Sequence, residues 1–69
     1  MAEYVLETGQ TVLEVLISGG LVQSKSEGRR MVNQNGVRLD GETLKDASQP
    51  FPHSGVLQVG KRRFLRVLN

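Results

Sequence analysis

The apolar positions divide the chain into two helix-like segments followed by several strand-like ones. Residues 12–17 are apolar except at Glu14, and Thr11 stands three residues before that glutamate. This is the spacing of a capping box, in which a hydroxyl and a carboxylate each satisfy a backbone amide at a helix start. We predict a helix over 11–18, buried on most sides and stopped by the glycine pair at 19–20. A partner-binding amphipathic helix is the weaker alternative, because so short a chain needs these side chains in its core.

A second helix is predicted over about 25–34. Ser24 and Glu27 repeat the capping-box spacing, and the Asn-Gly pair at 35–36 supplies a left-handed residue that ends the helix. At about 100° per residue, this segment separates into two faces. The face fit for packing holds Gly28, Met31 and Val32. The opposite, polar face holds Ser26, Arg29, Arg30 and Asn33.

The second half of the chain has the alternation and turn signals of strands. Residues 37–39 and 42–44 are joined by Asp-Gly, a two-residue hairpin signal. Residues 56–59 and 64–68 are two further strand-like runs, joined by the basic turn 60–63. The alternation in 64–68 leaves open which of its faces packs inward.

The order helix, helix, strands predicts an α+β domain in which two short N-terminal helices pack on a small antiparallel β-sheet. We place this domain at residues 11–69. Residues 1–10 are the lead-in, where the sequence allows both a short extended stretch at 4–6 and a linker from a segment upstream. A chain of 69 residues buries only about 60% of its unfolded surface, so a small apolar core must stabilise it.

The distribution of charge is more informative than its net value of +2. Residues 24–38 carry four cations against one acid, and residues 60–69 carry four cations and no acid. The stretches 1–23 and 39–59 are net acidic. Two basic blocks separated by acidic ones indicate a localised anion-binding surface. The alternative is that both basic blocks are simply solvated surface, and the charge pattern alone does not distinguish this from an anion-binding surface.

The sequence contains no pattern that predicts a catalytic site or a metal-binding site. His53 is the only histidine and lies near prolines, without the context of an activated nucleophile. No glycine-rich phosphate loop is present, and seven acids without a cysteine show no metal-ligating cluster. No apolar run approaches the roughly 20 residues of a membrane helix. We therefore expect no enzyme activity, no cofactor, no metal ion and no membrane span.

The residues do support recognition of phosphate. The start of the second helix offers free backbone amides and the positive end of the helix dipole, and arginine binds phosphate through two nitrogens at once. Three aromatic residues, none in the pattern of a base-stacking platform, favour recognition of the shape and backbone of a structured RNA over capture of an unpaired strand. The candidate residues are Ser24, Lys25, Ser26, Arg29, Arg30, Lys61, Arg62 and Arg63.

A known family has a similar arrangement of residues. The run Ser-Lys-Ser-Glu-Gly-Arg-Arg-Met-Val at 24–32, with Asn-Gly-Val at 35–37 and Asp-Gly-Glu at 40–42, resembles an RNA-binding module named after the fourth small-subunit ribosomal protein. This is the S-four module, or alpha-L motif, and the likeness is close over 11–44. The ending Leu-Gln-Val-Gly-Lys-Arg-Arg-Phe at 57–64 is similar to the C-terminal domain of bacterial-type tyrosyl-tRNA synthetases.

This resemblance implies a tRNA partner, namely the tRNA for tyrosine, bound chiefly around its long variable arm and anticodon stem. It also implies that a separate catalytic domain of the same chain activates the amino acid, so that this part is a non-catalytic appendage. The implied enzyme is cytoplasmic and a homodimer, whereas the isolated domain is a monomer. By position, the module implicates Ser24, Lys25, Ser26, Arg29 and Arg30, the synthetase tail implicates Lys61, Arg62 and Arg63, and the same surface includes Arg38.

Gly28 departs from the family pattern, because alanine is usual at its position. Glycine inside a helix costs roughly 1 kcal/mol relative to alanine, so the departure puts the rigidity of the second helix in doubt more than its binding. Close approach to the first helix or to a ligand backbone would explain Gly28, and ordinary sequence drift is the alternative.

Two other functions stay open. The second hypothesis is a stand-alone S-four protein that acts on ribosomal RNA, or the guide module of an RNA-modifying enzyme, although the synthetase-like ending argues against it. A protein-interaction or linker domain, whose basic face meets an acidic partner, is a different class of function. Titration with tRNA would separate these from the first hypothesis.

Overall fold

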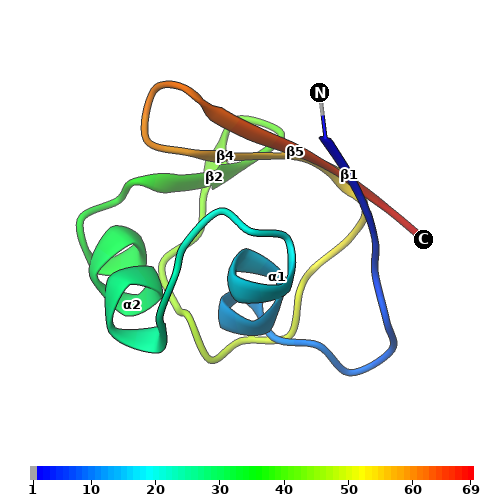
Figure 1. The fold of residues 1–69 in the computed structure, drawn as a ribbon, viewed down its shortest axis with the longest axis horizontal. Coiled ribbons are helices and arrows are strands. Elements are labelled where there is room, and N and C mark those ends of the chain that lie inside the picture. The colour runs from blue at the N-terminus through cyan, green and yellow to red at the C-terminus, as the bar shows by residue number, and fades with distance from the viewer. Residues whose placement is uncertain (1) are drawn as a thin grey trace.

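The computed structural model describes residues 2–69 and has two helices on one face of a five-stranded sheet (Figure 1). The helices are α1 (Val12–Ser18) and α2 (Lys25–Asn33). The strands are β1 (Ala2–Val5), β2 (Val37–Leu39), β3 (Glu42–Thr43), β4 (Gly55–Val59) and β5 (Arg63–Leu68). The predicted α+β class is confirmed, and the helix and strand bounds lie within one or two residues of those expected.

The sheet has the order β1-β5-β4-β2-β3 and is mixed. The pairs β2–β3, β2–β4 and β4–β5 are antiparallel, as expected. In addition, β1 pairs with β5 in parallel, with Ala2 opposite Leu65 and Val5 opposite Leu68. Parallel pairing is possible because the chain passes through both helices and three strands between β1 and β5. The first residues of the lead-in therefore take the extended alternative and add an edge strand.

The core lies between α1 and the face of the sheet that the helices cover. Val12, Val15 and Leu16 of α1 are 0% exposed, which confirms a helix buried on most sides. The sheet contributes Val37, Leu39, Leu57, Val59, Leu65 and Val67. The open question about β5 is thereby answered, since Leu65 and Val67 point inward and Phe64 and Arg66 point to the solvent.

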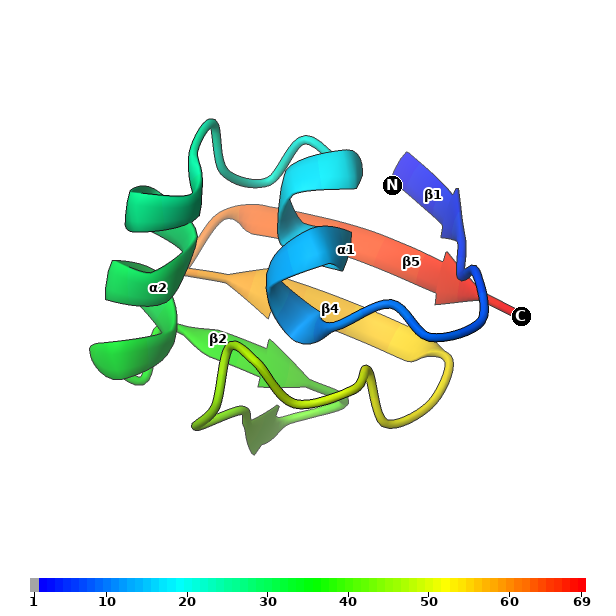
Figure 2. The same cartoon turned by 90° about the horizontal axis from the view of Figure 1, so that it is seen from below.

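Helix α2 lies beside α1 at the end of the sheet next to the β4–β5 turn (Figure 2). Gly28 and Val32 are buried, whereas Arg29 and Arg30 are exposed, so the two predicted faces are confirmed. A Cβ atom at Gly28 would collide with a terminal methyl group of Leu13 on α1. Gly28 is therefore a packing residue at the contact between the helices.

Candidate nucleic-acid interface

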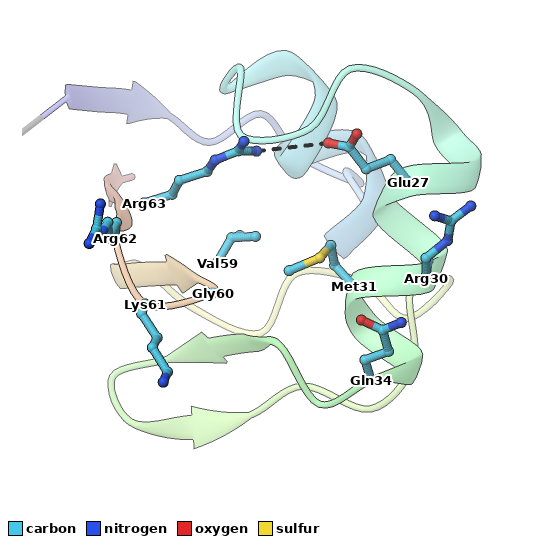
Figure 3. A pocket seen from close by; sticks show the side chains of 9 residues that line it. All are labelled: Glu27, Arg30, Met31, Gln34, Val59, Gly60, Lys61, Arg62 and Arg63. Carbon is cyan, nitrogen blue, oxygen red and sulfur yellow. Dashed lines mark ion pairs between the residues drawn. The ribbon is translucent and has the colours of Figure 1, made fainter.

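A groove of about 640 Å³ lies between α2 and the β4–β5 turn (Figure 3). Met31 and Val59 form its apolar floor, and Arg30 and Gln34 follow each other one helical turn apart on the α2 side. We call it the basic groove, and its lining consists of Glu27, Arg30, Met31, Gln34, Val59, Gly60, Lys61, Arg62 and Arg63. Four cationic side chains against one carboxylate give the groove a net positive charge, which favours anions over cations.

The β4–β5 turn is held against α2 near both ends of the helix. Near the C-terminal end, the Gly60 amide donates a hydrogen bond of 2.8 Å to the Gly36 carbonyl. Near the N-terminal end, Arg63 Nη1 donates a hydrogen bond of 2.6 Å to the Leu21 carbonyl. The same nitrogen lies 3.8 Å from Glu27 Oε1. The width of the basic groove is therefore set by contacts between its two walls.

Arg63 has a different position from the other three cations of the groove. Its side chain reaches across to α2, whereas Lys61 and Arg62 project from the turn without approaching the helix (Figure 3). A guanidinium has five N–H donors, so Arg63 keeps some for an anion. Its charge is nevertheless partly balanced by Glu27, which leaves Arg30, Lys61 and Arg62 as the more available cations.

The start of α2 differs in one respect from the prediction. The Ser24 hydroxyl accepts a hydrogen bond of 3.2 Å from the Glu27 amide, as a capping box requires. The returning bond from the Ser24 amide to the Glu27 carboxylate is not formed within the described residues 2–69, so the prediction of a complete box is wrong here. The Glu27 carboxylate instead lies on the side of Arg63, with Oε1 3.8 Å from the guanidinium Nη1.

The other predicted residues of α2 lie outside the groove. Ser24, Lys25, Ser26 and Arg29 are exposed but do not line it. The structure thus places Arg30 together with the three basic residues of the turn and leaves Arg29 on the outer surface of the helix. An RNA that contacts both arginines must extend beyond the groove and over the exposed face of α2.

Arg38 lies at a second, smaller hollow of about 320 Å³ around the β4–β5 turn. We call it the turn hollow, and its lining consists of Asn35, Gly36, Arg38, Gln58, Gly60 and Lys61. Gly60 and Lys61 also line the basic groove. The two hollows are therefore contiguous, and Arg38 belongs to the same surface as the turn.

Sequence reasoning missed several residues of this surface. Gln34 follows Arg30 at the i+4 spacing of a helix, so the periodicity could have found it. The roles of Met31 and Val59 as a floor, and of Leu21 as an acceptor, depend on contacts between distant segments and leave no local signal. Gln58 stands in a strand whose orientation only the sheet register reveals.

Residues 2–69 contain no group of three or more histidine, cysteine, aspartate or glutamate side chains that could hold a metal ion. Within the same described range, neither helix has the length and apolar character needed to cross a membrane.

Comparison with known proteins gives a consistent result. A family model described as S4 domain matches residues 13–56, which confirms the resemblance to the S-four module. The chain is 46% identical over 68 residues to tyrosine–tRNA ligase 2 of Vibrio cholerae serotype O1, covering 97% of this chain and 17% of that protein. It is 46% identical over 65 residues to tyrosine–tRNA ligase of Geobacter metallireducens, covering 90% of this chain and 16% of that protein.

A third, more divergent relative extends over nearly the whole chain. It is tyrosine–tRNA ligase of Dehalococcoides mccartyi, 36% identical over 70 residues, which cover 99% of this chain and 18% of that protein. The chain thus spans less than a fifth of the length of each of these relatives. The similarity concerns one region of a much longer protein.

Proposed function

Because the chain belongs to the S4 domain family of RNA-binding modules, we propose that it binds the tRNA for tyrosine as the C-terminal appendage of a tyrosyl-tRNA synthetase. The observation that carries this proposal is the basic groove, which is lined by four cations and one carboxylate and lies next to the exposed face of α2. The similarity to tyrosine–tRNA ligases over most of the chain supports the choice of tRNA.

In this proposal the module is non-catalytic, and the amino acid is activated in another domain of the longer chain. The module is monomeric by itself, the longer enzyme is a homodimer, and the protein acts in the cytoplasm. Tethering to the catalytic domain would raise the effective concentration of the module near the bound tRNA. Sedimentation of the 69-residue chain tests the monomer, and a sedimenting dimer would contradict that part.

The proposed mode of binding is electrostatic and guided by shape. The exposed arginines of α2 and the cations of the turn contact phosphates on the variable arm and the anticodon stem. The fixed distance between α2 and the turn selects a backbone of matching width, because both walls are held by the contacts of Arg63 and Gly60. Phosphate contacts of this kind position an RNA without reading its bases.

The test is a titration of tyrosine tRNA at several salt concentrations, followed by gel shift. We expect a log–log dependence of affinity on salt with a slope of roughly −0.7 to −0.9 for each phosphate neutralised. Arg29→Ala combined with Arg30→Ala weakens binding and leaves the far-UV circular dichroism unchanged. Lys45→Ala is the matched control, because Lys45 is exposed and lines neither hollow. A flat salt dependence would contradict the mechanism.

The competing functions give different outcomes in the same titration. Stronger binding to a ribosomal RNA hairpin than to tyrosine tRNA would favour a stand-alone S4 protein acting on the ribosome, or a guide module of a modifying enzyme. If neither RNA gives a gel shift at low salt, both RNA-binding hypotheses are contradicted and an acidic protein partner is favoured.

A further inference from the structure

The face of the sheet turned away from the helices is open and carries one aromatic side chain. Phe64 on β5 is 42% exposed. It stands opposite Gln58 on β4, and Gln58 stands opposite Arg38 on β2. Directly opposed residues in an antiparallel sheet lie side by side on one face. Phe64, Gln58 and Arg38 therefore form a row across the outer face, which we call the outer row.

The chemistry of the outer row matches that of an unpaired nucleotide. An exposed ring offers a stacking surface for any base, and such stacking is sequence-tolerant. The Gln58 side-chain nitrogen donates to the Gly60 carbonyl at 3.0 Å, which orients the amide and leaves its oxygen free to accept. Arg38 adds a guanidinium that can bind the phosphate of the stacked nucleotide. Ring, amide and guanidinium thus follow one another along adjacent strands.

The outer row is continuous with the surface already proposed to bind RNA. Arg38 and Gln58 line the turn hollow together with Gly60 and Lys61, and the last two also line the basic groove. A backbone that leaves the basic groove around the β4–β5 turn therefore arrives at the outer row without crossing an acidic region.

The charge and apolar content of this face favour a nucleic acid over a protein. In the next row, Arg66 is the cross-strand neighbour of Val56 and of Glu3, and its Nη1 lies 3.9 Å from Glu3 Oε2. Arg38 takes part in none of the ion pairs of residues 2–69, so its guanidinium is available to a phosphate. Val5, the other large exposed apolar residue, stands on the edge strand opposite Leu68, so Phe64 and Val5 do not form one apolar patch.

We propose that an unpaired nucleotide of the bound RNA stacks on Phe64, with its phosphate at Arg38. The proposal rests on the proposed function and deepens it, because it adds recognition of a single-stranded element to binding of a structured stem. Sequence alone left the orientation of β5 open, so Phe64 could not be assigned to an exposed face.

Tryptophan fluorescence gives a direct test, because the chain contains no tryptophan. The Phe64→Trp variant carries a single tryptophan, at the proposed stacking position, whose emission can be excited separately from that of Tyr4. It is titrated with a blunt RNA duplex and with the same duplex bearing a three-nucleotide single-stranded overhang. We expect quenching with the overhang RNA and none with the blunt duplex. Val5→Trp is the matched control, since Val5 is 63% exposed but lies on the edge strand β1, away from the outer row. Its emission stays unchanged with both RNAs.

Affinity measurements separate stacking from a structural role. Phe64→Leu lowers affinity for the overhang RNA by about five- to a hundredfold, the range of base–aromatic stacking, and leaves affinity for the blunt duplex unchanged. Equal losses with both RNAs, or unchanged emission of Phe64→Trp while the overhang RNA binds, would overturn the stacking proposal and leave the proposed function standing. Failure of the unaltered chain to bind the overhang RNA would overturn the stacking proposal, and failure to bind tyrosine tRNA as well would overturn the proposed function with it.

Discussion

The two helices begin with the same sequence pattern and use it differently. At α1, the Thr11 hydroxyl accepts from the Glu14 amide at 3.2 Å, and the Thr11 amide donates to Glu14 Oε1 at 3.0 Å. Both arms of that capping box are formed. At α2, the Ser24 hydroxyl accepts from Glu27, but the Glu27 carboxylate faces Arg63 of the β4–β5 turn.

Residue spacing determines which capping bonds are possible, whereas the neighbouring side chains determine which of them are made. Glu14 is exposed at the start of a helix buried against the core, and no cation is paired with it among the ion pairs of residues 2–69. Glu27 lines a groove with four cations. α1 therefore closes its own terminus, and α2 uses its glutamate to connect the helix to the proposed interface.

The largest loss of stability is expected for a substitution in α1, the helix that packs in the core. Leu16 of α1 is 0% exposed, and Leu→Ala changes at such positions cost about 2–5 kcal/mol in the free energy of unfolding. In a domain this small, Leu16→Ala leaves much of the chain unfolded. Urea denaturation followed by circular dichroism measures the loss, with Arg29→Ala on the exposed face of α2 as the control. A loss below about 1 kcal/mol would contradict the assignment of α1 to the core.

This part of the structure was also the part that the sequence could predict. The bounds of both helices follow from caps and glycines, and the hairpin at 40–41 follows from its Asp-Gly pair, with φ angles of 51° at Asp40 and 88° at Gly41. All of these signals are local. The pairing of Arg63 with Leu21, 42 residues away, depends on how the sheet returns to the helices, and no local pattern encodes it.

Local signals predicted part of the candidate site as well. The basic composition of α2 and of the turn is evident from the sequence, and Arg30, Lys61 and Arg62 line one groove in the structure. The sequence could not separate Arg29 from Arg30, because their positions on the helix differ by only about 100°. It could not place Phe64 either, since both faces of the alternating run 64–68 carry apolar side chains.

The next effect tests whether Arg63 positions the groove. Arg63→Gln removes the charged donor to the Leu21 carbonyl and the pairing with Glu27, and it lowers the free energy of unfolding by about 1 kcal/mol, discounted because the side chain is largely exposed. Arg30→Gln changes the free energy of unfolding by no more than about 0.5 kcal/mol.

The salt dependence of RNA binding gives a second measurement on the same two variants. Arg30→Gln reduces the slope by about 0.7–0.9, and Arg63→Gln reduces it less. If Arg63→Gln reduced the slope more than Arg30→Gln, Arg63 would be a primary phosphate ligand and not a residue that positions the groove.

A smaller effect distinguishes the two glutamates. Glu27→Gln removes the one acid of the basic groove and raises RNA affinity by about two- to fivefold, corresponding to a surface charge interaction of about 0.4–1 kcal/mol. Glu14→Gln leaves RNA affinity unchanged, because Gln also completes a capping box and Glu14 does not line the groove. Parallel titrations with tyrosine tRNA compare the variants. If the Glu27→Gln and Glu14→Gln variants bind tyrosine tRNA with equal affinity, Glu27 does not influence binding of the RNA.

The smallest effect concerns the contact that joins the two helices. Gly28→Ala adds helix propensity of roughly 1 kcal/mol, but its Cβ displaces a terminal methyl of Leu13. Leu13 is 8% exposed, and its methyl can move toward the edge of the core, so we expect a net stabilisation of a few tenths of a kcal/mol. Gly28→Val adds branches toward Val22, whose Cγ2 already lies 3.4 Å from the first added carbon, and destabilises. Urea denaturation measures both. Stabilisation by valine would show that α2 can move away from α1, and that the groove is less firmly held than its contacts indicate.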